Sequence, residues 1–131
     1  NGRQVKVYDQ SNLSRVRTIT PFGYSAPGVT VAVGGGWLAC GKIAGDGEVR
    51  VLNLQSLQLE KVFLTQTSAS PKSGIGGTRL AWTESEPGQW ELMVGSGSGW
   101  SASVEYWLSG TWNRREVKSE FSSWQGGIWV A

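Results

Sequence analysis

The sequence has no histidine and only one cysteine among its 131 residues, and both features narrow the chemistry that it can perform. Without histidine, neither a Ser-His-Asp nor a Cys-His catalytic site can form, and every histidine-containing metal site is excluded. Cys40 alone can form neither an intrachain disulfide nor a cysteine-cluster zinc site. It ends the apolar stretch Trp37–Cys40, where we expect a small buried thiol. A lone cysteine also favours a reducing, intracellular compartment.

Charge and long apolar runs are scarce as well. Charged residues make up 17% of the chain and the net charge is +2 at pH 7, so the balance of charge gives no argument for binding nucleic acid. No apolar run approaches the ~20 residues that cross a membrane, and we expect no membrane contact.

Glycine and tryptophan are abundant, with 19 and 8 residues in a chain whose length suits one domain. Hydrophobic periodicity is almost entirely of the two-residue kind that is typical of half-buried strands, as in 5–8, 49–52 and 104–106. No segment shows a convincing helical stripe. The sequence therefore predicts an all-β fold.

Internal repetition is the strongest signal. Residues 4–19 align without a gap to residues 48–63, each as a strand, a short polar turn and a second strand, and residues 103–117 form a third copy. The spacing is 44 residues from Val5 to Val49 and 55 from Val49 to Val104. Two further strands precede each of the later copies, which predicts four strands per repeat.

These repeats predict a division of the chain into four segments. We expect the end of one four-stranded unit at 1–23, whole units at 28–64 and 77–119, and the first strand of a further unit at 126–131.

The pattern resembles the WD40 family of β-propellers. Gly45–Asn53 is similar to the tight turn and third strand of that family, with Asp46-Gly47 at its turn position. Tyr8-Asp9 and Leu52-Asn53 stand where the family places its Trp-Asp dipeptide, and Trp107-Leu108 keeps half of it. The Gly-His dipeptide of the family is absent from every repeat because the chain has no histidine.

The resemblance implies four-stranded antiparallel propeller blades. A closed propeller needs roughly 4–8 blades, so 131 residues are too short to close a ring alone. We therefore expect a protein partner or a second chain that completes the propeller, or several copies that form a homo-oligomer.

Candidate binding residues are aromatic and cationic. Tryptophans in predicted turns or links can stack on sugars or on partner side chains, and the alternative is that they wedge between blades. Two arginines beside one of them suit an acidic partner, with a solvated strand face as the alternative. These residues are Trp100, Trp112, Trp124, Arg114 and Arg115.

The remaining motifs have structural interpretations. Asp46 and Gly47 are expected to form a turn. Glu84 and Glu86 form a closely spaced carboxylate pair, which would suit a glycoside hydrolase, but their Pro-Gly context favours a solvated hairpin loop. Gly34–Gly36 and Gly95–Gly99 are expected to be turns between strands, because neither has the lysine of a phosphate-binding loop.

The sequence thus predicts a non-catalytic binding module without cofactor, a β-propeller segment that acts as a protein-interaction scaffold. The alternative is a carbohydrate-binding propeller lectin that holds a glycan with exposed tryptophans, and such a lectin would be secreted.

Overall fold

The computed structural model describes residues 3–65, 76–99, 103–118, 127–128 and 130–131. The described residues form ten β-strands and no helix, which confirms the predicted all-β class. In this part of the chain there is accordingly no helix with the length and apolar character needed to span a bilayer.

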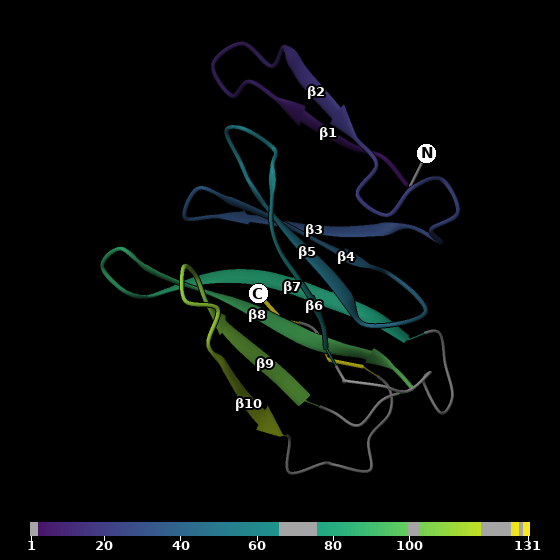
Figure 1. Ribbon diagram of the computed structural model, residues 1–131, viewed down its shortest axis with the longest axis vertical. Helices are drawn as coiled ribbons and strands as arrows, with labels where there is room; N and C mark the ends of the chain where they lie inside the picture. Colours follow the sequence, from purple (N-terminus) through teal and green to yellow (C-terminus); the bar gives the residue numbers. More distant parts are fainter. Residues whose placement is uncertain (1–2, 66–75, 100–102, 119–126, 129) are drawn as a thin grey trace.

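The strands form three antiparallel sheets in chain order (Figure 1). The first hairpin contains two strands, and the middle sheet and the last sheet contain four each, in the orders β3-β4-β5-β6 and β10-β9-β8-β7. Four-stranded antiparallel sheets are what the repeats predicted. The bounds are β1 Val5–Tyr8, β2 Arg15–Ile19, β3 Val29–Gly34, β4 Trp37–Lys42, β5 Glu48–Asn53, β6 Leu59–Leu64, β7 Gly76–Glu86, β8 Gln89–Ser98, β9 Ser103–Leu108 and β10 Arg114–Lys118.

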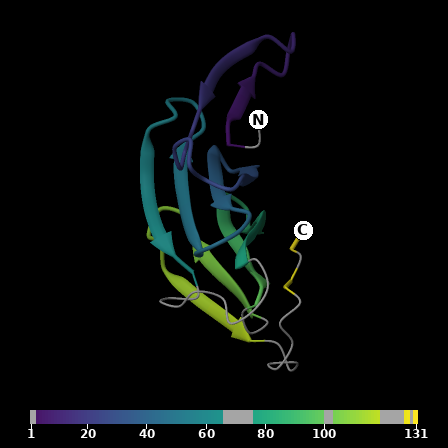
Figure 2. The same ribbon diagram turned by 90° about the vertical axis from the view of Figure 1, so that its right-hand side faces the viewer.

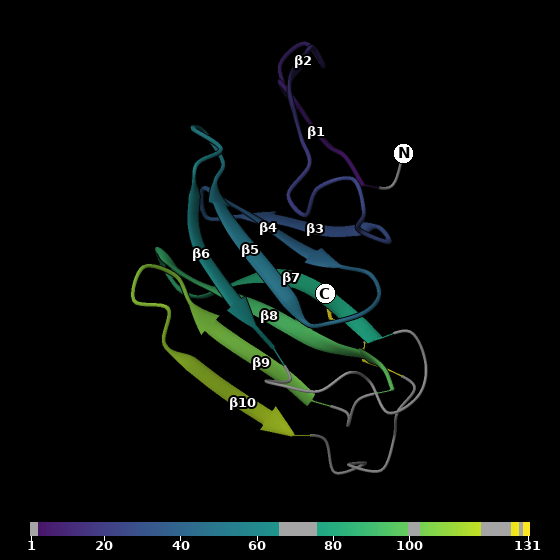
Figure 3. The same ribbon diagram turned by 45° about the vertical axis from the view of Figure 1, so that its right-hand side comes forward.

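The three sheets follow one another along the long axis of the molecule (Figure 2). In Figure 3, β6 and β10 lie at the same outer edge of their sheets, whereas β3 and β7 lie at the opposite edge. None of the sheets closes into a barrel within the described residues.

One turn recurs in all three layers at the predicted spacing. In each layer, the first residue of the turn is Asp9, Asn53 or Leu108. Its N–H donates to the carbonyl of the residue five positions later, and its own carbonyl accepts the N–H of the residue four positions later. That fourth residue is Leu13, Leu57 or Trp112, with φ of 59°, 57° and 56°. The left-handed conformation costs energy for a side chain of this size, so the surrounding hydrogen bonds must hold it.

Side-chain oxygens support two of these turns. Asp9 Oδ1 accepts the Ser11 N–H at 2.8 Å, and Asn53 Oδ1 accepts the Gln55 and Ser56 N–H groups, each at 2.9 Å. Short polar side chains are suited to this role because they can fold back on their own backbone. The equivalent residue in the last sheet, Leu108, has no such oxygen.

Two apolar clusters separate the three layers. The cluster between the middle and last sheets contains fully buried aliphatic residues together with a stacked pair, Phe63 and Trp107, whose ring centroids lie 4.0 Å apart. The cluster between the first hairpin and the middle sheet contains Leu38, Cys40 and Leu52, with residues of the hairpin packed against them. The layers are therefore held together by side chains from both of their facing surfaces.

The glycines at the end of β3 and just after it, Gly34 and Gly35, have a role that the sequence analysis missed. They were predicted only as a turn, and Gly35 does turn the chain with φ of 57°. A Cβ at Gly34 would overlap the Trp82 side chain, and a Cβ at Gly35 would overlap the Trp90 ring. These two glycines therefore make room for two tryptophans of the last sheet.

The described residues of the predicted strand 126–131 form no strand, contrary to expectation; Gly126 and Trp129 lie outside the described residues. The Ile128 N–H donates to the Ser96 carbonyl at 2.8 Å, and the Ile128 carbonyl lies against Gly95 of β8. Gly95 already has ladder neighbours in β7 and β9, so this segment lies over the face of the last sheet.

Candidate binding groove

A groove of about 530 Å³ lies between the first hairpin and the middle sheet. Its walls come from strands β1 and β2 and from the β3 side of the middle sheet, with part of the β5–β6 turn. Most of its lining is apolar, as in sites that bind other molecules. The lining residues are Val5, Lys6, Val7, Tyr8, Gln10, Val16, Arg17, Val31, Val33, Leu38, Leu54 and Gln55.

Valines of β3 form the exposed floor of this groove. Val31 is 47% exposed and Val33 is 59% exposed, whereas the neighbouring strand β4 is almost entirely buried. The sequence analysis did not single them out. The signal was present, because Val29–Val33 is apolar at nearly every position, and such a strand is normally covered on both faces.

Arg17 joins the two walls of the groove. Its guanidinium donates to the Ser56 carbonyl at 2.9 Å and to the Gln55 carbonyl, both in the turn between β5 and β6. These bonds connect β2 to the middle sheet at one end of the groove. Arg17 thus has a structural role.

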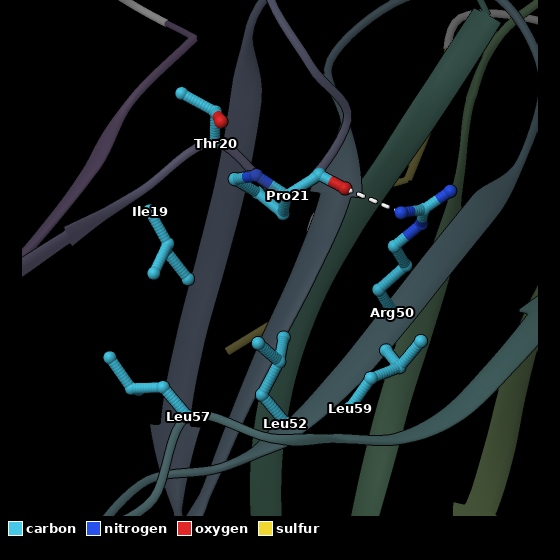
Figure 4. Close-up of a pocket in the computed structure, with 7 residues that line it drawn as sticks. All are labelled: Ile19, Thr20, Pro21, Arg50, Leu52, Leu57 and Leu59. Carbon is cyan, nitrogen blue, oxygen red and sulfur yellow. Dashed lines mark hydrogen bonds between the residues drawn. The ribbon is translucent and has the colours of Figure 1, made fainter.

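A second, smaller hollow of about 230 Å³ lies farther along the same layer boundary (Figure 4). Arg50 projects into it and donates to the Pro21 carbonyl at 2.8 Å, while Glu48 accepts from its Nε and Nη2, both at 2.8 Å. Because its donors are engaged, Arg50 fastens the segment after β2 to β5. The other lining residues are Ile19, Thr20 and three leucines, Leu52, Leu57 and Leu59.

A network of charges surrounds Glu48. Lys42 Nζ lies 3.0 Å from Glu48 Oε2 and 3.0 Å from Asp46 Oδ1. Burial opposes ionisation of Glu48, but hydrogen bonds from Lys42 and Arg50 outweigh it, so the pKa of Glu48 is lowered. Burial lowers the pKa of Lys42, but hydrogen bonds to Glu48 and Asp46 outweigh it, so that pKa is raised.

Asp46 and Gly47 occupy the turn between β4 and β5. Asp46 Oδ1 accepts the Glu48 N–H at 3.2 Å. The Gly47 carbonyl accepts from both the N–H and the hydroxyl of Thr65, each at 3.0 Å. A Cβ at Gly47 would overlap Thr65, so glycine is required there by packing.

Trp112 lies between the middle and last sheets. Its ring meets Trp37 edge to face, with centroids 5.5 Å apart and an interplanar angle of 73°. It packs against the apolar cluster that joins these two sheets. Trp112 thus fills space between the two four-stranded sheets. Trp100 and Trp124 lie outside the described residues.

Arg114 and Arg115, predicted as a cationic site or a solvated strand face, lie on opposite faces of the last sheet. Adjacent strand residues point to opposite faces, and both arginines have carboxylate partners. Arg114 Nη1 lies 2.9 Å from Glu105 Oε1, on the face toward the middle sheet. Arg115 lies 4.2 Å from the centroid of the Tyr106 ring and pairs with Glu91 at 3.8 Å.

Glu105 is the most deeply buried acid of the described residues, with 1% of its surface exposed. Its Oε2 and the neighbouring Trp107 Nε1 form no hydrogen bond within the described part of the chain. Burial raises the pKa of Glu105. The charge of Arg114 opposes this increase most strongly. The indole N–H of Trp107 also lowers the pKa, although it forms no hydrogen bond with the carboxylate.

Glu84 and Glu86 lie near the β7–β8 turn and are exposed. Glu84 Oε1 accepts the Gly88 N–H at 2.8 Å, so this carboxylate closes the turn. Among the described residues, no three His, Cys, Asp or Glu side chains gather where they could hold a metal ion.

Comparisons of the chain with protein-family models, with curated proteins and with solved structures find no match.

Proposed function

We propose that this chain is a non-catalytic binding module, a stack of blade-like β-sheets that acts as a protein-interaction scaffold. The observation that carries the proposal is the uncovered apolar floor formed by Val31 and Val33 beside the groove. Soluble proteins rarely leave contiguous apolar surface exposed unless another molecule covers it.

The proposal includes a propeller-like arrangement of the layers. It is supported by the turn that recurs with the same hydrogen bonds in all three layers, and by the identical strand order of the two four-stranded sheets. The resemblance to WD40 repeats points the same way. In such an arrangement another polypeptide or further copies would supply the missing blades.

Native mass spectrometry of the chain, purified without denaturation, tests this function. We expect a mass above 14.1 kDa, from either a second, different chain or several copies. Cross-linking from a photoreactive residue at position 33 should then label the added chain. A 14.1 kDa monomer at every concentration and from every source of expression would contradict the proposal.

The lectin alternative has less support from the described residues. Trp112 is engaged with Trp37, so stacking on a sugar would depend on Trp100 and Trp124, which lie outside the described residues. Binding to a glycan array that is lost in the Trp100→Ala and Trp124→Ala variants, but retained in Trp112→Ala, would favour the lectin over the scaffold.

A further inference from the structure

The repeated turn defines which residues are equivalent in the three layers. Equivalent residues lie 44 positions apart between the first hairpin and the middle sheet, and 55 positions apart between the middle and last sheets. The ladders follow the same offset, since Val5 faces Ile19 in the first layer as Val49 faces Phe63 in the next. Residues at one layer boundary can therefore be compared with their equivalents at the other boundary.

The hollow of Figure 4 has a filled counterpart at the second boundary, between the middle and last sheets. The hollow is lined by the end of β2 with the segment that follows it, and by β5, β6 and the turn between them. Every one of these lining residues has a described equivalent at the second boundary. The two places can thus be compared residue by residue.

Two stacked rings occupy this place at the second boundary. Phe63 stacks on Trp107, with ring centroids 4.0 Å apart and an interplanar angle of 20°. Their equivalents at the first boundary are Ile19 and Leu52, which both line the hollow. Two smaller aliphatic side chains therefore stand where the second boundary has two rings.

The turn residue differs in the same direction. Leu57 lines the hollow, whereas its equivalent Trp112 packs against the apolar cluster of the second boundary. The backbone conformation is the same at both residues, with φ of 57° and 56°. Because each ring has a described aliphatic residue at the equivalent position, the hollow results from smaller side chains and not from strands outside the described residues.

The hollow has the size and polarity of a site for an uncharged ring. Its volume is about 230 Å³, and an apolar cavity of roughly 150 Å³ is enough to bind benzene. Arg50 is the one charged residue in its lining. The guanidinium of Arg50 is already bound to Glu48 and to the Pro21 carbonyl, so a charged ligand would find no unmatched charge there.

We propose that this hollow binds a small, uncharged aromatic molecule of one or two rings. The molecule lies against Ile19, Leu52 and Leu57, at the place where the second boundary holds rings of its own. Flat rings suit the space because stacked rings fit between the equivalent strands of the next two layers. The site goes beyond the proposed scaffold function, which depends on the groove farther along the same boundary.

Indole is the probe that tests the site. We expect indole to cause saturable shifts in the methyl NMR signals of Leu52, Leu57 and Leu59 in the whole chain, with a Kd of about 1 mM or lower. The methyl signals of Leu92, which is buried at the second boundary, should not move. This contrast locates the bound molecule in the hollow.

Phenol and cyclohexanol test the preference for a flat ring. The two molecules contain the same carbon and oxygen atoms, but only the ring of phenol is flat. Phenol should displace indole at a concentration about threefold lower than cyclohexanol requires, or lower still.

Two tryptophan variants supply a matched pair. Leu57→Trp should weaken indole binding by about tenfold or more, because its ring fills the hollow. Trp112 shows that this position of the turn accepts tryptophan. Leu13→Trp places the same ring at the same turn position of the first hairpin, where Leu13 is 75% exposed and lies outside the lining of the hollow. This variant should bind indole as wild type does, and circular dichroism verifies the fold of both variants.

Three results would overturn the inference: no saturable shift of the leucine methyl signals, binding that Leu57→Trp leaves unaltered, or equal displacement of indole by phenol and cyclohexanol. The native mass judges the scaffold function separately. A complex seen there together with any of these three results would remove the aromatic site and leave the scaffold function standing.

Discussion

At the scale of single residues, the buried carboxylate of Glu105 makes stability depend on pH. Because burial raises its pKa above the ordinary 4.5, the folded state binds a proton more tightly than the unfolded state. The wild-type free energy of unfolding should therefore fall as pH rises from about 4.5 through the raised pKa. Glu105→Gln removes this titration, so its stability relative to wild type should increase with pH, as measured by urea unfolding between about pH 4 and about pH 8.

Glu48→Gln is the control, with the opposite sign. The pKa of Glu48 is lowered, so its contribution to stability is present above the ordinary value and is lost as pH falls through the lowered one. The advantage of wild type over Glu48→Gln should therefore shrink on acidification. Parallel pH trends for the two variants would contradict both assignments.

The single thiol should be unreactive in the folded protein. Cys40 is fully buried, and burial raises its pKa to about 12, so almost no thiolate forms at neutral pH. We expect a disulfide reagent such as Ellman's to modify it at least about a hundredfold more slowly in buffer than in denaturant. Equal rates in the two conditions would show that the boundary between the first hairpin and the middle sheet is open.

At the scale of the structural element, the recurring turn allows a direct comparison of strain with packing. Leu13 and Trp112 share the left-handed conformation, but Leu13 is 75% exposed, whereas Trp112 packs on Trp37. Leu13→Gly relieves strain without losing contacts and should change stability by between zero and about +1 kcal/mol. Trp112→Gly should cost about 2–4 kcal/mol, because the lost aromatic contacts outweigh the relief.

Thermal or urea unfolding of the two variants provides the measurement. Equal effects would mean that the Trp112 ring adds nothing to the contact between the two four-stranded sheets.

Much of this element-level structure could be predicted from the sequence. Alternating apolar residues and the spacing of the repeats gave the hairpins and the two four-stranded sheets, since both depend on local pattern. The left-handed conformation of Leu57 and Trp112 could not be predicted, because neither residue favours it and only the surrounding hydrogen bonds impose it.

The candidate site was less predictable, because it depends on how layers meet. Loop tryptophans and paired arginines suggested exposed contacts, yet Arg114 is matched by Glu105 across the ladder and Trp112 by Trp37 across a layer boundary. Conversely, Val31 and Val33 are typical core residues in sequence. Their exposure depends on which side chains of the neighbouring layer lie against them, and local pattern does not encode this.

At the scale of the whole molecule, replacing a buried leucine by alanine should lower the free energy of unfolding by different amounts at the two layer boundaries. Leu38 and Leu92 are equivalent in the ladders and almost fully buried, but Leu38 also borders the groove. Leu92→Ala should cost about 3–5 kcal/mol, because the closed boundary retains the cavity. Leu38→Ala should cost about 2–3 kcal/mol, since the open side can relax.

Urea unfolding of both alanine variants tests this difference. A larger loss for Leu38→Ala than for Leu92→Ala would contradict the unequal closure of the two boundaries.

The stacking of layers also has a consequence for how the molecule opens. The middle sheet has a described layer on each face, whereas the first hairpin touches the rest of the described structure along one face only, beside a groove. Amide exchange should therefore be slowest in β4 and β5 and fastest in β1 and β2, and a protease should nick the hairpin while the two four-stranded sheets stay intact. The first hairpin would then open and close locally while the two four-stranded sheets remain folded.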